Sequence, residues 1–272
     1  MMYQHITAHC FVNVPYPRLV QDFDLIRTHR LQPEIGLEGE WLYTTPMKEF
    51  VAMGERLRAE GLACTLHAPF FDLMPGALDR QIRTASRDKL RRAFELLPIF
   101  QPRSIVCHLG YEEYKHRFKQ QEWFSHARET FAELLAMAEA HSVTLMLENT
   151  YETSPEQLQA MLAALGSPHA RFCFDLGHSL AFAKTSWREW FPAMAPWLGQ
   201  LHIHDNHGDR DEHLAPGQGN FDFASFFDFL AAERLDPIIT LEPHSEEGLW
   251  QSLAALDRMK CFKGIINTNK NA

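Results

Sequence analysis

Eight short apolar segments alternate with helix-like segments along this chain, and this alternation restricts the fold more than any other feature. The apolar segments have the length of buried strands: His5–Val12, Pro33–Glu38, Ala63–His67, Ser104–His108, Thr144–Glu148, Arg171–Asp175, Gly199–His204 and Pro237–Glu242. Apolar residues recur with helical spacing in Tyr16–Leu31, from Pro46 to Gly61, and in Asp79–Phe100, Trp123–His141, Ser154–Leu165, Ser186–Trp197, Asp222–Glu233 and Glu246–Phe262. Such alternation predicts parallel strands joined by crossover helices, and eight strands close a barrel. We therefore expect an α/β protein with a (β/α)8 TIM barrel.

The length and the loops agree with one barrel. The chain has 272 residues, and a (β/α)8 barrel typically needs about 250. We find neither an internal repeat nor a Pro/Gly/Ser-rich linker, so residues 1–272 are expected to form a single domain. The longest predicted loops, 68–78 and 205–221, follow the third and seventh strands, where long loops usually build or cover the active site.

Charge and cysteine content exclude several classes of protein. The formal net charge is −9, which argues against a general surface for nucleic acid or anionic membrane. No apolar run reaches transmembrane length, and the first residues lack the pattern of a secretory signal. The five cysteines are odd in number, form no C-x-x-C pair, and partly fall in predicted strands: Cys10, Cys64, Cys107, Cys173 and Cys261. We expect a cytoplasmic protein.

Five predicted strands end in residues that bind metals. These are His67, Glu148, Asp175, His202 and Glu242. Because strand side chains alternate between faces, the three carboxylates converge at one rim of the barrel if their faces point inward. Three unpaired carboxylates would repel one another, so a cation is expected among them unless each pairs with Lys or Arg. Glu148, Asp175, His202 and Glu242 form an oxygen-rich set with one imidazole, which suits Mn, Mg, Co or Zn.

A second layer of polar residues follows the same strands. His67, His108, His178, Asp211 and His213 are candidates for further metal ligands. Candidates for substrate contacts are His67, His108, His178, His204 and Asp205. A single isolated histidine is more often a satisfied core or loop residue, but a position beside the first set favours function.

Two further features are weak signals. The segment Gly217-Gln218-Gly219-Asn220 is able to cradle an anion with backbone amides, although a plain turn is the commoner explanation of such a sequence. Trp41, Phe70 and Phe71 follow early strands, and either form an apolar wall over a substrate or pack in the core.

The motifs at these strand ends resemble those of the xylose-isomerase-like barrel superfamily, which contains sugar isomerases, sugar 3-epimerases and endonuclease IV. The matching segments are His67-Ala68-Pro69-Phe70, Leu147-Glu148-Asn149, Phe174-Asp175-Leu176-Gly177-His178, His202-Ile203-His204-Asp205-Asn206, Asp211-Glu212-His213-Leu214, Gly217-Gln218-Gly219-Asn220 and Leu241-Glu242-Pro243. In the epimerase branch, the resemblance implies that Glu148, Asp175, His202 and Glu242 hold one divalent ion. It also implies that the two glutamates act as acid and base.

Endonuclease IV offers an alternative resemblance. Its three zinc ions imply nine ligands here: His67, His108, Glu148, Asp175, His178, His202, Asp211, His213 and Glu242. Two departures weaken this match: the family's Asp-Thr-Cys-His is Asp175-Leu176-Gly177-His178, and its Asn-Asp after the seventh strand is His204-Asp205. The acidic charge also suits DNA poorly.

We therefore expect a metal-dependent sugar or sugar-phosphate isomerase or epimerase. Proton transfer between Glu148 and Glu242 would proceed through an enediolate, with one ion of Mn, Zn, Co or Mg favoured and room for up to three. The alternatives are a zinc phosphodiesterase of the endonuclease IV type and a non-catalytic protein that binds a metal or a sugar. A small sugar is the expected partner, without nucleic acid or membrane, and a homo-oligomer is compatible with this interpretation.

Overall fold

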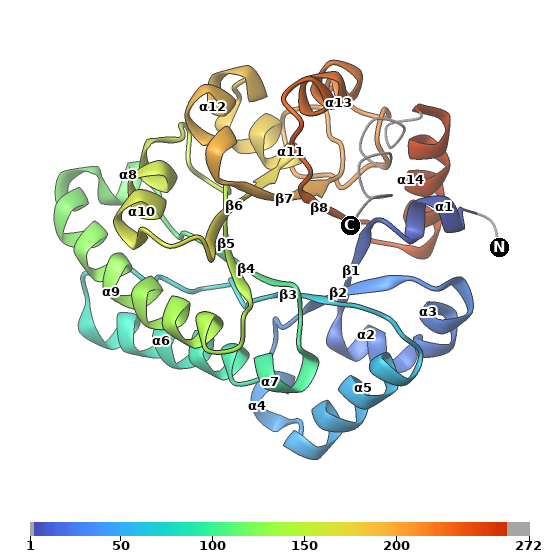
Figure 1. Ribbon diagram of the computed structural model, residues 1–272. Coiled ribbons are helices and arrows are strands. Elements are labelled where there is room, and N and C mark those ends of the chain that lie inside the picture. The colour runs from blue at the N-terminus through green and yellow to red at the C-terminus, as the bar shows by residue number, and fades with distance from the viewer. Residues whose placement is uncertain (1–2, 260–272) are drawn as a thin grey trace.

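The computed structural model describes residues 3–259 and forms a closed barrel of eight parallel strands in the order β1 to β8 (Figure 1). Each strand pairs in parallel with its neighbours, and β1 pairs with β8 to close the ring. The strands are β1 Phe11–Pro15, β2 Gln32–Gly36, β3 Thr65–His67, β4 Ser104–His108, β5 Thr144–Glu148, β6 Ala170–Asp175, β7 Leu198–Ile203 and β8 Ile238–Leu241. The expected (β/α)8 barrel is confirmed.

Helices surround the strands as an outer ring (Figure 1). They are α1 Gln4–Thr7, α2 Tyr16–Gln21, α3 Phe23–His29, α4 Trp41–Thr44, α5 Met47–Ala59, α6 Arg80–Phe94, α7 Leu97–Phe100, α8 Glu113–His116, α9 Gln120–Glu139, α10 Glu156–Leu165, α11 Leu176–His178, α12 Trp187–Met194, α13 Phe223–Ala232 and α14 Glu246–Met259. Short irregular helices η1 Arg117–Lys119, η2 Ser179–Ala183 and η3 Ala195–Trp197 complete the set. Within residues 3–259, none of these helices combines the length and apolar character needed to span a bilayer.

The first predicted strand is wrong in its first half. Residues Gln4–Thr7 form helix α1, and strand β1 begins only at Phe11. The apolar pattern of this segment is short enough to fit either structure. Pairing decides the matter, because Phe11 aligns with Gln32 of β2 and with Thr240 of β8.

Two predicted helices are each divided in the structure. The first breaks at Asp22, whose backbone φ of −104° and ψ of 21° lie outside the helical region, giving α2 and α3. The second helix ends at Phe94, and a new short helix, α7, begins at Leu97. Pro98 lies in the first turn of α7, where the missing proline N–H costs no helical hydrogen bond, whereas it would interrupt the interior of a longer helix. The last predicted helix is described to Met259, and its final residues lie outside the described range.

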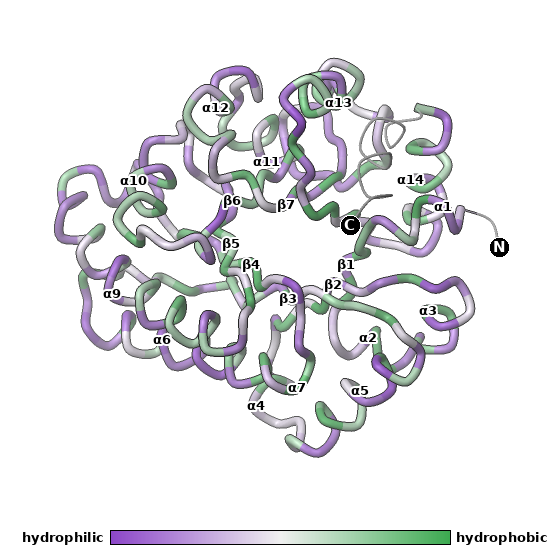
Figure 2. Tube along the Cα trace, in the orientation of Figure 1, coloured by the Kyte–Doolittle hydropathy of each residue, from purple (hydrophilic) through white to green (hydrophobic). Residues whose placement is uncertain are grey.

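Strand parity places the candidate ligands on the inner face of the barrel. Val106, Met146 and Cys173 form a small buried cluster inside the ring, separate from the large core between the strands and helices. Along the ring of strands, apolar segments drawn in green are interrupted by hydrophilic segments drawn in purple (Figure 2). Met146 and Cys173 each lie two residues before a candidate ligand, Glu148 or Asp175, so these carboxylates also point inward. The predicted parity is confirmed.

Candidate metal centre

Glu148, at the end of β5, lies at the middle of the candidate ligands. Its Oε2 atom lies 3.1 Å from Nε2 of His67 and 3.1 Å from Nε2 of His108. Its Oε1 atom lies 3.0 Å from Nδ1 of His202 and 3.4 Å from Nδ1 of His178. The carboxylate therefore connects residues from β3, β4, α11 and β7, and only 1% of the residue is exposed.

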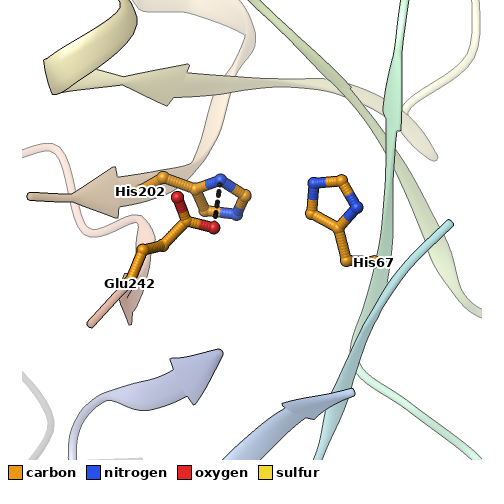
Figure 3. Close-up of side chains that lie close together, drawn as sticks. All are labelled: His67, His202 and Glu242. Atoms are coloured by element: carbon orange, nitrogen blue, oxygen red, sulfur yellow. Dashed lines mark ion pairs between the residues drawn. The ribbon is translucent and has the colours of Figure 1, made fainter. Parts of the chain in front are cut away.

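The other residues of the expected first set gather around His202, whose Nδ1 also faces Glu148. His202 Nδ1 lies 3.2 Å from Glu242 Oε1 and 3.9 Å from Asp175 Oδ2. His67, His202 and Glu242 point toward one another across the inside of the barrel (Figure 3). The structure thus brings together the four residues of the first set, and no Lys or Arg of the described chain lies within ion-pair distance of them.

Glu34 is a buried acid beneath this cluster that the sequence analysis missed. Its carboxylate accepts hydrogen bonds from Thr65, Gln200 and Thr240, and its Oε1 lies 3.1 Å from His202 Nε2. The contact engages the side of the His202 ring opposite to Nδ1. The sequence did contain a signal for this role, because Glu34 lies in the middle of a predicted buried strand. A carboxylate is rarely buried there unless a hydrogen-bond or ion-pair partner lies beside it.

The surroundings of the two glutamates shift their pKa values in opposite directions. Burial alone would raise the pKa of Glu148, but the histidines around it, led by His202 and His108, bring it well below the ordinary value. Burial raises the pKa of Glu242, and the nearby carboxylates of Asp175 and Glu148 add to this against the opposing effect of His202. Two carboxyl groups with opposite shifts are a common feature of acid–base sites.

A further group of ligand-type residues surrounds Asp211, in the loop after β7. Asp211 Oδ2 lies 3.0 Å from His213 Nε2 and 3.4 Å from His178 Nε2, and Oδ1 lies 3.6 Å from His204 Nδ1. His178 and His213 counteract the effect of burial and hold the pKa of Asp211 far below its ordinary value. Against the cost of burial, Asp211 and Glu242 raise the pKa of His213 to about 9. The structure therefore brings all the expected additional ligands to one end of the barrel.

Asp205 has a structural role rather than the expected position for substrate contact. The residue is fully buried, and its carboxylate accepts hydrogen bonds from the backbone N–H groups of Asn206, Gly217, Gly219 and Phe221. The segment containing Gly217 and Gly219 does cradle an anion, but this anion is Asp205 itself. Its four accepted bonds organise the loop that carries Asp211.

A cavity of about 990 Å³ opens above the cluster. Its described lining includes Glu148 and Glu242, the histidines expected to contact substrate (His67, His108 and His178), and an apolar side formed by Phe70, Phe71 and Phe182. Phe70 stacks on His108 with ring centroids 4.5 Å apart. Trp41 instead packs against Tyr16, with ring centroids 4.9 Å apart, so of the three expected wall residues only Phe70 and Phe71 line the cavity.

The donor atoms fit a divalent metal ion. Glu148, Asp175 and His202 offer ligand atoms within 4.8 Å of one another, as do His67, His108 and Glu148. Burial of several carboxylates together requires positive charge, which protons on the histidines or a metal ion can supply. Two buried atoms that face each other, His204 Nδ1 and Asp211 Oδ1, have no hydrogen-bond partner within the described residues. A cation between such atoms would satisfy both.

Comparisons with known proteins agree with this geometry. The sequence profile of a family described as xylose isomerase-like TIM barrel matches residues 34–261. The uncharacterized protein MJ1311 of Methanocaldococcus jannaschii is 27% identical over 262 residues, covering 92% of this chain and 86% of that protein.

Solved structures share the fold at low sequence identity. A D-tagatose 3-epimerase-like protein has a TM-score of 0.78 at 22% identity, covering 92% of this chain and 97% of that chain. The TTHB071 protein of Thermus thermophilus, soaked with ZnCl2, has a TM-score of 0.76 at 22% identity, covering 94% and 98%. A D-psicose 3-epimerase of Clostridium cellulolyticum has a TM-score of 0.71 at 14% identity, covering 92% and 98%. Since the family profile covers most of the sequence, this chain belongs to the xylose isomerase-like TIM barrel family.

Proposed function

We propose that this protein is a divalent-metal-dependent isomerase or epimerase of a sugar. The observation that carries the proposal is the cluster of Glu148, Asp175, His202 and Glu242 at the base of a cavity that is lined by both glutamates. Epimerases among the structural neighbours support the proposal at the level of the fold. The four residues would hold one ion of Mn, Zn, Co or Mg.

The chemistry needs a proton acceptor and a proton donor near a polarised carbonyl. A bound ion would polarise the substrate carbonyl and stabilise the negative charge that develops when an α-proton leaves. Glu148 is the better first acceptor, because the histidines around both of its oxygens hold its pKa well below the ordinary value and keep the carboxylate ionised. Glu242, whose pKa is raised by burial, would hold the proton that is returned to the resulting enediolate. His67, His108 and His178 would bind substrate hydroxyls.

The cavity favours a sugar without a phosphate group. Lys115 is the one Lys or Arg in the described lining, and its Nζ lies 2.5 Å from Glu112 Oε1. Glu38, Asp72 and Glu112 add negative charge to the same lining. A phosphate would therefore meet net negative charge, whereas a neutral sugar places its apolar face on Phe70 or Phe182 and its hydroxyls toward the histidines.

Solvent isotope exchange tests the proposal whichever product the reaction forms. The metal-free protein is reloaded with Mn, Co, Mg or Zn and incubated with a panel of ketopentoses and ketohexoses in deuterium oxide. Proton NMR then measures loss of the signal from the carbon-bound hydrogen next to the carbonyl. Glu148→Gln and Glu242→Gln should abolish exchange with the fold intact, while Glu212→Gln, which alters a loop carboxylate that pairs with His207, should retain it. Absence of exchange with every ion and ketose would contradict the proposal, as would exchange that survives both glutamine variants.

A zinc phosphodiesterase is the second candidate, because a specific observation favours it. The clusters of His67 and His108 with Glu148, and of His178 and His213 with Asp211, offer two further places for zinc. DNA binding falls steeply with salt because it depends on contacts between Lys or Arg and phosphates. Given the acidic lining, we expect neither binding to a duplex with an abasic site near 150 mM salt nor incision with zinc, as followed by fluorescence anisotropy and gel electrophoresis. Salt-dependent binding with cleavage at the abasic site would favour the phosphodiesterase.

A further inference from the structure

A series of three rings leads outward from Glu148 along the wall that follows β3 and β4. His108 Nε2 lies 3.1 Å from Glu148 Oε2, and Phe70 stacks on His108 with ring centroids 4.5 Å apart. Phe71 adjoins Phe70 at a centroid distance of 4.5 Å, and 63% of Phe71 is exposed. Because all three rings line the cavity, Phe71 is the outer end of this wall.

A second series has the same arrangement in the segments after β5 and β6. His178 Nδ1 lies 3.4 Å from Glu148 Oε1, and the ring centroid of Phe182 lies 5.2 Å from that of His178. Tyr151 adjoins Phe182 at a centroid distance of 4.9 Å and is 54% exposed. These three rings also line the cavity, so an exposed aromatic ring ends each series.

The backbone that carries Phe71 is held by a carboxylate. Glu38 Oε2 accepts hydrogen bonds from the backbone N–H groups of Phe70 at 2.6 Å and of Phe71 at 2.9 Å. Its Oε1 accepts a hydrogen bond from Lys89 Nζ at 2.7 Å, which connects this loop to α6. Hydrogen bonds to a charged group are about twice as strong as neutral ones. Phe71 is therefore exposed on a loop whose backbone is fixed.

Tyr151 is likewise exposed between two buried neighbours. Thr150 and Glu152 are 3% and 2% exposed, and the backbone N–H of Thr150 donates to Glu152 Oε2 at 2.8 Å. Burial of an aromatic ring is favourable, and neither Phe71 nor Tyr151 gains this in full within the folded chain. Exposed aromatic rings that line a cavity are typical of a surface that binds a further molecule.

The cavity is large for a single sugar ring. Its volume of about 990 Å³ is at the upper end of the range for ligand cavities, which span about 300–1,000 Å³ and enclose drug-sized molecules. The inner rings of Phe70 and Phe182 are sufficient for the reacting sugar. Asp72, Glu112 and Lys115 add hydrogen-bonding groups to the same lining. A second ring with an apolar face and several hydroxyl groups matches this combination of aromatic and polar side chains, whereas a phosphate would meet the two carboxylates.

We propose that Phe71 and Tyr151 form a second subsite, which binds a neutral sugar ring joined by a glycosidic bond to the reacting ketose. Each aromatic face would stack on the apolar C–H face of this ring, while the polar side chains of the lining bind its hydroxyl groups. The substrate class is then a ketose disaccharide or a larger glycoside of a ketose, rather than a free ketose. The inference rests on the proposed function, because it places the reacting ketose at Glu148 and Glu242.

A second copy of the chain is the competing occupant of two exposed rings. Tyr114 and Phe118 are more exposed, at 91% and 81%, and lie outside the described lining of the cavity. Phe71 and Tyr151 instead continue the two series of rings that begin at Glu148. This position favours a ligand of the cavity over a neighbouring chain.

Calorimetric titration measures whether a second ring adds affinity. The zinc-loaded protein is titrated with fructose and with lactulose, maltulose and isomaltulose, each of which joins a second hexose ring to fructose. At least one of these disaccharides should bind more tightly than fructose by about tenfold, a difference of about 1.4 kcal/mol. If all of them bind no more tightly than fructose, the inference is overturned.

Variants of the two outer rings test where the second sugar ring binds. Phe71→Ser and Tyr151→Ser should each remove most of the preference for the disaccharide and leave the affinity for fructose unchanged. Both side chains are exposed, so thermal denaturation should show an intact fold. Tyr114→Ser, which alters an exposed ring outside the described lining, is the matched control and should keep the preference. A preference that survives in both variants would refute the inference. A change from oligomer to monomer in gel filtration, with sugar affinities unchanged, would also refute it and identify an interface between copies.

The two proposals can fail separately. If fructose undergoes exchange that needs both glutamates but no disaccharide binds more tightly, the inference about the outer rings fails and the proposed function stands. If the preference for a disaccharide depends on the outer rings and neither ketoses nor ketose disaccharides undergo exchange with any ion, the proposed function fails and the subsite stands as a sugar-binding site.

Discussion

Glu152 gives a prediction whose size follows directly from its surroundings. This residue lies in the loop after β5, is 2% exposed, and accepts a hydrogen bond from the backbone N–H of Thr150 at 2.8 Å. Its Oε1 atom has no hydrogen-bond partner within the described residues. Burial raises the pKa of Glu152 from 4.5 to about 7, against the opposing effect of the Thr150 hydrogen bond. The ionised side chain therefore destabilises the folded state.

The sign and the magnitude follow from proton linkage. Between pH 4.5 and about 7 the unfolded chain releases this proton while the folded chain keeps it, so stability falls as pH rises through this window. Above pH 7 the full penalty is present, and at about 1.4 kcal/mol per pH unit it amounts to about 3 kcal/mol. Glu152→Gln keeps an acceptor for Thr150 and carries no charge, so it should remove the penalty.

Urea unfolding of metal-free protein at several pH values measures the effect. Glu152→Gln should be nearly as stable as the unaltered protein at pH 5 and more stable by about 3 kcal/mol at pH 8. Effects of the many other titrating groups cancel in this difference. Glu55→Gln, on the exposed side of α5, is the matched control and should give a difference that does not depend on pH. A difference for Glu152→Gln that is equally independent of pH would refute the reasoning.

Three further expectations follow from the site. Gly177→Ala should lower the free energy of unfolding by about 1–3 kcal/mol in thermal denaturation, since its Cβ would overlap His204, whereas Gly248→Ala in α14 should not lower it. Glu34→Gln should weaken metal binding by roughly 10–100-fold in chelator competition because it alters the group beside His202 Nε2; unchanged affinity would rule out this role. Affinity for zinc at the Asp211 site should rise with pH up to about 9, as His213 loses its proton, and calorimetry in buffers of different ionisation enthalpy should detect proton release.

The sequence predicted the fold and the site best where an apolar strand pattern ends directly in a ligand-type residue. Apolar runs that end in Glu148, Asp175 and His202 predicted strands, their inward faces and the end of the barrel where the ligands meet. Parity was sufficient for this, because the side chains of a strand alternate strictly and the ends of parallel strands meet at one rim. The first strand was misplaced because a short apolar run fits a helix or a strand equally well, and only pairing with β2 and β8 distinguishes them.

Sequence alone therefore determined the barrel, its inward faces and the residue types at its rim. Tertiary structure decided which of those residues contact each other and through which atoms. Asp205 binds the amides of its own loop, Glu34 supports His202 from below, and His204 faces Asp211 in the space left by Gly177. These contacts join residues far apart in the chain, and they depend on ring orientation and on free volume between packed elements. Neither quantity is expressed in local periodicity or motif spacing, so only the folded arrangement reveals them.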